Sequence, residues 1–91
     1  MEVHFAPSFE RILKKLDAPI KEEVKETVSK VIDFYLSSHK THGLGVKRLQ
    51  GDIWEARAGI RIRVLYELTK NRVSFVLAGS HDDVKNFLKR L

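Results

Sequence analysis

Three arginines near the middle of the chain could bind a phosphate group together. The run from Leu49 to Phe75 reads LQGDIWEARAGIRIRVLYELTKNRVSF, and Arg57, Arg61 and Arg63 have the same parity within it. Alternate side chains of a strand point to opposite faces, so these arginines are expected on one face of a small sheet. A guanidinium holds a phosphate through two parallel hydrogen bonds. The pattern therefore predicts a phosphate-binding face.

Basic and titratable residues flank these strands. Lys47 and Arg48 precede the first strand, and His81 follows the last one, next to a helix start. If the chemistry of this face is RNA cleavage, it needs a base for the 2′-hydroxyl proton, cations for the charge on phosphorus and an acid for the leaving oxygen. The arginines suit the cationic role. His81 suits acid or base duty because imidazole exchanges protons near neutral pH.

Glu55 shares the predicted face of the arginines. Pairing the apolar faces of the first two strands places Glu55 and Arg57 beside Arg61 and Arg63, and arginines that face each other repel. Glu55 could neutralise one arginine as a structural partner, and a phosphate or an acidic partner would neutralise the rest. A solvated surface, with acids paired against the arginines, is the alternative interpretation. The acids available for it are Asp52, Glu55 and Glu67.

Composition excludes several classes of function. The chain has 91 residues, which suffices for one domain, and its net charge of +5 favours an acidic or polyanionic partner. The absence of cysteine rules out disulfides, thiolate catalysis and cysteine-based zinc sites. His39 and His42 lack an evident third ligand, so neither a metal nor another cofactor is predicted. Without a signal peptide or a long apolar run, we expect a cytoplasmic protein with no membrane partner.

The apolar periodicity and turn signals predict the elements that position these residues. A short strand from Val3 to Phe5 precedes a helix that starts at Pro7 and Ser8. A longer helix follows Asp17-Ala18-Pro19, with a loop from Ser37 to Gly45 after it. The predicted strands that follow are Ile53 to Ala58, Ile60 to Leu68, and Arg72 to Ala78.

A last helix is expected after these strands. Ser80 and Asp83 have capping-box spacing, and the apolar stripe beyond them is Val84, Phe87, Leu88 and Leu91. Short turns between the strands favour an antiparallel meander. The order β-α-α-β-β-β-α over residues 1–91 therefore predicts one α+β domain. It has two layers, with a small, mainly antiparallel sheet packed against two N-terminal helices.

The ordered segments LQGDIWEARAG, IRVLYEL and VSFVLAGSHDDVKNFL resemble the RelE/ParE superfamily of toxins from type II toxin–antitoxin systems. The positions that match the family pattern are Leu49, Gly51, Trp54, Glu55, Arg57, Arg63, Val64, Leu65, Tyr66, Gly79 and His81. The resemblance covers nearly the whole chain because the β-α-α start also fits. It implies a RelE-like fold and neutralisation by a cognate antitoxin, with a heterotetramer as one expected assembly.

The resemblance also implies roles for individual residues. Arg63 occupies the position of the arginine that contacts the scissile phosphate in ribonuclease members, and Arg57 matches another basic position. His81 stands where members have a catalytic arginine or histidine. The residues expected to bind phosphate or RNA are Lys47, Arg48 and Arg61, with Glu55 in support. The family's best-known catalytic lysines would fall near Ile53 and Glu55, and its C-terminal catalytic tyrosine is replaced by Phe87.

Function follows as an expectation with open alternatives. The resemblance to RelE-type members implies an mRNA endoribonuclease, or mRNA interferase, that acts on the ribosome and mRNA without a metal and inhibits translation. ParE-type members instead inhibit DNA gyrase without catalysis, which Phe87 would permit. A third alternative is a degenerate member that binds nucleic acid or an antitoxin without toxicity.

Overall fold

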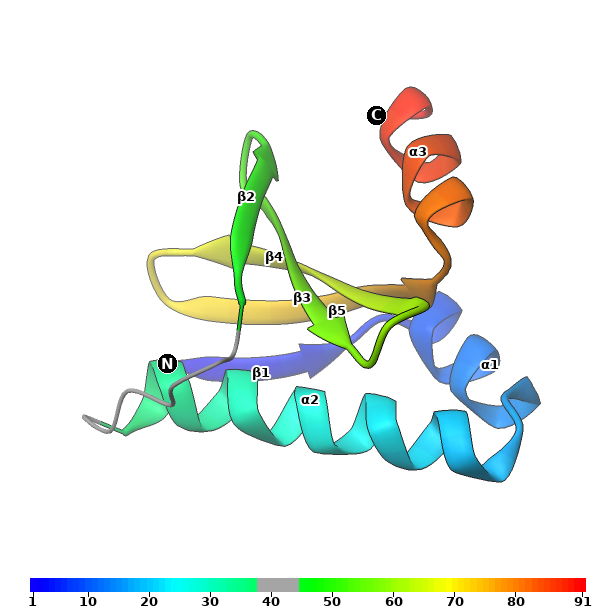
Figure 1. Ribbon diagram of the computed structural model, residues 1–91. Helices are drawn as coiled ribbons and strands as arrows, with labels where there is room; N and C mark the ends of the chain where they lie inside the picture. Colours follow the sequence, from blue (N-terminus) through cyan, green and yellow to red (C-terminus); the bar gives the residue numbers. More distant parts are fainter. Residues whose placement is uncertain (38–44) are drawn as a thin grey trace.

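A five-stranded sheet with the order β1-β5-β4-β3-β2 forms the centre of the fold. The computed structural model describes residues 1–37 and 45–91. The elements are β1 (Glu2–Phe5), α1 (Pro7–Lys15), α2 (Ala18–Leu36), β2 (Lys47–Gln50), β3 (Ile53–Ala58), β4 (Ile62–Thr69), β5 (Arg72–Gly79) and α3 (His81–Lys89). β1 runs parallel to β5, and the other neighbouring strands are antiparallel. α1 and α2 lie along one side of the sheet and α3 rises on the other (Figure 1).

The predicted fold class is confirmed, and the order of elements is corrected by one strand. Lys47 and Arg48 do not merely precede the sheet, because Lys47–Gln50 form β2 at its edge. The register against β3 shifts between Arg48 and Gln50, which leaves Leu49 without a partner of its own. A four-residue bulged strand shows no regular alternation, so its sequence pattern is weak. Most of the predicted loop, with His39 and His42, falls on residues 38–44, outside the described residues.

Proline helps to start both N-terminal helices. Pro7 is the first residue of α1 and Pro19 lies in the first turn of α2, where a missing N–H costs nothing. Three valines of α2 are buried against the sheet together with Thr27; they are Val24, Val28 and Val31. The Thr27 hydroxyl donates a hydrogen bond to the backbone oxygen of Arg57 over 3.3 Å. This contact fixes β3 to the helix layer.

The main core fills the space between the sheet and the two N-terminal helices. Its fully buried side chains include Phe9, Val24, Val31, Val64, Tyr66, Val73 and Phe75. The hydroxyl oxygens of Tyr35 and Tyr66 are 2.9 Å apart. Burial raises the pKa of Tyr66 well above its usual range, and the hydrogen bond to Tyr35 adds to the shift. The folded protein therefore favours the neutral form of the Tyr66 phenol over the charged form.

This buried phenol predicts a loss of stability at alkaline pH. In the unfolded chain tyrosine loses its proton above about pH 10, whereas folded Tyr66 keeps it. The folded state then binds more protons, so the free energy of unfolding falls by up to about 1.4 kcal/mol per pH unit above about pH 10. Urea unfolding at about pH 9 and about pH 11 should show this slope in the wild type and lose it in Tyr66→Phe. Tyr35→Phe should keep it, because burial is the larger cause; equal slopes in wild type and Tyr66→Phe would contradict the assignment.

A smaller core lies between the sheet and α3. Its buried residues are Ile53, Leu65 and Val84, and the half-buried ones around them are Leu49, Val76, Leu77, Phe87 and Leu88. A bulge in β5 supplies two neighbouring side chains to this core: Leu77 pairs with Leu65 and Phe75 pairs with Tyr66, which leaves Val76 extra. The Ser8 hydroxyl donates to the Val76 carbonyl oxygen over 3.2 Å.

The end of α3 differs from the prediction. Leu91 was expected in the apolar stripe, but α3 ends at Lys89 and Leu91 is 62% exposed.

Among the described residues, no helix combines the length and the apolar content that crossing a membrane requires.

Candidate functional site

A cavity of about 550 Å³ lies between β2, β3 and β4 on one side and α3 on the other. It opens on the sheet face opposite α1 and α2. Its lining residues are Gly45, Val46, Lys47, Leu49, Glu55, Arg57, Arg63, His81, Val84, Lys85 and Leu88. The sequence predicted a site from five of these: Lys47, Glu55, Arg57, Arg63 and His81. The structure brings these five together.

The predicted pair of facing arginines is present. The register of β3 and β4 places Arg57 directly opposite Arg63, and β5 places Gly79 on the other side of Arg63. Glu55 Oε1 lies 3.1 Å from Nε of Arg63, with side chains 11% and 18% exposed, respectively. The expectation that Glu55 neutralises one arginine is therefore confirmed. Within the described part of the chain, Arg57 has no ion-pair partner.

The start of α3 holds His81 at the cavity. The predicted capping box is confirmed, because the Asp83 backbone N–H donates to Ser80 Oγ over 3.2 Å and the Ser80 N–H donates to Asp83 Oδ2 over 2.9 Å. His81 is the first residue of the helix that this box begins. Gly79 leaves room for it, since a Cβ at that position would lie 2.8 Å from Cβ of Asp83. His81 is exposed, so its ring nitrogens are accessible to a ligand in the cavity.

Two predicted phosphate-binding residues lie elsewhere. Arg61 was expected on the arginine face, but β4 begins only at Ile62, and Arg61 lies in the turn opened by Gly59 at φ 81°. It lines a different cavity, with Ile20 and Glu23. Arg48 points away from the site because its partner on β3 is Trp54, and its Nε donates to the Gly51 carbonyl oxygen over 2.7 Å.

Two of the three positions that depart from the catalytic residues implied by the resemblance, Ile53 and Phe87, belong to the smaller core. Ile53 is 7% exposed and belongs to the smaller core. Phe87 also packs there and lines another cavity, with Ile12 and Leu16 of the α1 region. Neither side chain lines the cavity that holds Arg57, Arg63 and His81. Packing therefore accounts for both residues.

Sequence reasoning missed Lys85. It lies four residues after His81, and side chains at this spacing share one face of a helix. Lys85 lines the cavity together with His81 and has no ion-pair partner among the described residues. The signal that could have found it is this spacing, since a basic residue one turn beyond a candidate histidine is expected beside it.

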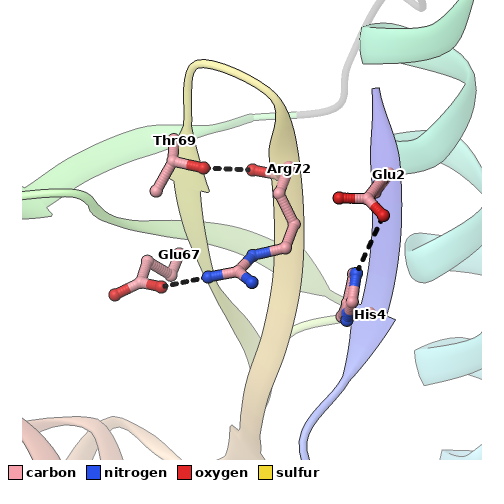
Figure 2. A network of polar contacts seen from close by, with 5 residues as sticks. All are labelled: Glu2, His4, Glu67, Thr69 and Arg72. Carbon is pink, nitrogen blue, oxygen red and sulfur yellow. Dashed lines mark hydrogen bonds and ion pairs between the residues drawn. The ribbon is translucent and has the colours of Figure 1, made fainter.

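Another arginine of the same sheet face lies outside the cavity. Arg72 Nη2 is 4.0 Å from Glu67 Oε1, and the Thr69 hydroxyl donates to the Arg72 carbonyl oxygen over 3.3 Å. Figure 2 shows this cluster at the β4–β5 turn, beside Glu2 and His4 of β1. Acids therefore pair with arginines in two places, Glu67 with Arg72 and Glu55 with Arg63. These pairs leave Arg57 in the cavity available to an anion.

The cavity gathers the kinds of side chain that binding a phosphate and moving a proton would require. It combines the permanent cations Lys47, Arg57, Arg63 and Lys85 with a single carboxylate, Glu55, and one imidazole, His81. Charge of this sign attracts a phosphodiester, and the arginine geometry matches its oxygens. Across residues 1–37 and 45–91, no three side chains of the metal-binding types His, Asp and Glu gather at one place.

Comparison with known proteins finds the fold but no close relative. No protein-family model matches the sequence, and no curated protein matches it. The chain is similar to one in the E. coli DinJ–YafQ toxin–antitoxin complex, with 16% identity, a TM-score of 0.72 and coverage of 91% of this chain and 94% of that one. It is also similar to a chain of the RelB–RelE antitoxin–toxin complex from Methanococcus jannaschii, with 17% identity, a TM-score of 0.69 and coverage of 92% and 96%.

A third similarity is to a chain of the YoeB–YefM complex from Staphylococcus aureus, with 18% identity, a TM-score of 0.58 and coverage of 89% of this chain and 97% of that one. In each case the whole domain superposes rather than a fragment. These comparisons confirm the fold that the sequence resemblance implies.

Proposed function

From the RelE fold of this chain we infer that it is the toxin of a type II toxin–antitoxin module, and we propose that it cleaves mRNA at the ribosome without a metal. The observation that carries this proposal is the cavity in which Arg57, Arg63 and His81 meet. The fold that this chain shares with the DinJ–YafQ chain extends over 91% of its length.

Each residue of the cavity has a distinct role in this proposal. In RNA cleavage the 2′-oxygen attacks phosphorus, its proton is removed, and the departing 5′-oxygen gains a proton. Arg63 contacts the scissile phosphate, in an orientation held by Glu55. Arg57, directly opposite, adds a second guanidinium where negative charge develops. His81 exchanges one of the two protons, a contribution typically worth about 10²–10⁴-fold in rate.

A cognate antitoxin is part of the same proposal. The solved complexes that share this fold contain DinJ, RelB or YefM as partners. An acidic or amphipathic segment that covers the cavity would neutralise Arg57 and Lys47, which have no ion-pair partner among the described residues. We expect such a partner to abolish toxicity by blocking access of mRNA to the site.

Induced expression in a bacterial host, followed by mapping of mRNA 5′ ends, tests the proposal. Wild-type protein should arrest growth and create new 5′ ends inside translated regions, and Arg63→Ala should create none. Purified protein added to a translation reaction should cut the message only when ribosomes are present.

Other outcomes would replace the proposal. Growth arrest with intact mRNA and impaired DNA supercoiling would indicate a noncatalytic gyrase inhibitor. Normal growth at full expression would indicate a relative that binds nucleic acid or an antitoxin without toxicity.

A further inference from the structure

The helix wall of the cavity carries a positive charge that the proposed chemistry does not use. Lys85 lies on α3 one turn after His81 and lines the cavity with it. Val84, the neighbouring residue, is 4% exposed and anchors this part of α3 to Ile53 and Leu65 of the sheet. Lys85 is therefore held at the cavity by a packed neighbour rather than by a long loop.

The charge in the cavity exceeds what one phosphate needs. The ion pair of Arg63 with Glu55 is neutral as a unit. Lys47, Arg57 and Lys85 remain, and none of them has an ion-pair partner within the described residues. A phosphodiester carries one negative charge, so this set can neutralise the scissile phosphate and its neighbours along a strand.

The positions of these cations form two walls. The sheet contributes Lys47 of β2, which pairs with Glu55 of β3, and Arg57 of β3. The other wall is α3, which contributes Lys85. The volume of about 550 Å³ lies within the range of pockets that bury a nucleotide-sized ligand. Half-buried or buried apolar side chains between the walls, Leu49, Val84 and Leu88, offer contact to a base or a ribose.

We propose that Lys85 binds a backbone phosphate next to the scissile one, so that single-stranded RNA lies between the sheet and α3. This inference rests on the proposed function and adds α3 as a binding wall. Lys85 contacts the strand as a point charge, without reading bases, so its contribution is the same for different sequences.

Binding of a short single-stranded 2′-O-methyl RNA, which cannot be cleaved, tests the inference. Fluorescence anisotropy over a range of salt concentrations gives the affinity and its salt dependence. Lys85→Ala should weaken binding about three- to five-fold at low salt, as expected for one exposed ionic contact. The slope of log K against log salt should become shallower by about 0.7, the value for one lost phosphate contact on a single strand.

Matched variants separate this contact from general charge. Lys89→Ala removes the same charge from the same helix at a residue that does not line the cavity, so it should leave affinity and slope unchanged. Lys85→Arg should retain both. Equal effects of Lys85→Ala and Lys89→Ala on affinity and slope would overturn the inference. The proposed function would still stand in that case if the wild-type protein cleaves mRNA. A wild-type protein that neither binds the oligomer nor cuts mRNA would overturn both.

Discussion

Arg63→Ala is expected to abolish growth arrest and to lower the rate of mRNA cleavage by about 10²–10³-fold. This is the cost of removing one fixed donor from the site where negative charge develops in a transition state. Arg63 is the arginine best fixed in place, because Glu55 lies 3.1 Å from its Nε and the strand neighbours Arg57 and Gly79 flank it. Cleavage of a defined message in a purified translation reaction measures the effect.

Two further variants make this result specific. Arg63→Ala leaves Glu55 without its partner at 11% side-chain exposure, so part of any loss could come from the fold. Arg63→Lys keeps a positive charge for Glu55 but cannot hold a phosphate bidentately, and it should still lose most of the activity. Arg72→Ala removes an arginine from the same sheet face outside the cavity and should retain full activity. An active Arg63→Lys protein with wild-type rates would count against the proposed contact.

Gly79→Ala is expected to destabilise the protein by about 1.5–5 kcal/mol and to abolish cleavage. The added Cβ would lie 2.7 Å from Oδ2 and 2.8 Å from Cβ of Asp83, so the start of α3 has to move. The cost combines crowding, about 1–3 kcal/mol, with loss of the capping box, about 0.5–2 kcal/mol. His81 would move with this end of the helix, away from the cavity that it lines together with Arg63. Urea unfolding and the cleavage assay together measure both effects.

Asp83→Ala separates the two contributions. It removes the carboxylate half of the capping box, keeps the Ser80 half and adds no atom at position 79, so it should cost only about 1 kcal/mol. Alanine at position 83 keeps the Cβ of Asp83, so the packing of α3 against Gly79 is unchanged in this variant. If Gly79→Ala and Asp83→Ala lose the same stability, crowding has no part in the effect and the close packing of β5 against α3 is not a requirement of the site.

Local rules predicted which faces of the two hairpin strands meet, and they predicted the last helix. Trp54, Ala56 and Ala58 form an apolar face, and so do Val64 and Tyr66. Joining these faces puts Arg57 and Arg63 on one face of the sheet, and the structure pairs them directly. A one-residue slip would expose every one of these apolar side chains, which is why the pattern determines the face that each residue occupies. The Ser80–Asp83 spacing likewise predicted the start of α3, because a capping box needs only two side chains and their own backbone.

Features that depend on tertiary contacts were not predicted. The three-residue turn after Ala58 displaces Arg61 from the strand, and its length is decided by how β3 and β4 meet rather than by the residues alone. The bulge at Val76 is supported by the hydroxyl of Ser8, far away in the sequence. Helix spacing places Lys85 beside His81, but the packing of this face of α3 against the sheet is a tertiary contact that no local pattern contains.

Because the core under α3 is small, the cavity depends on the fraction of molecules in which α3 is docked, as well as on the residues that line it. Val84 is the buried residue of α3, whereas α2 buries four, including Val24 and Val31. A helix with so few buried contacts opens at a lower free energy than the sheet beneath it. If the cavity binds RNA as proposed, RNA meets a complete cavity only in molecules with α3 docked, and the apparent affinity is the intrinsic affinity scaled by that fraction. Phe87 packs from α3 onto the smaller core without lining the cavity, so we expect it to affect activity by setting the fraction of molecules with α3 docked.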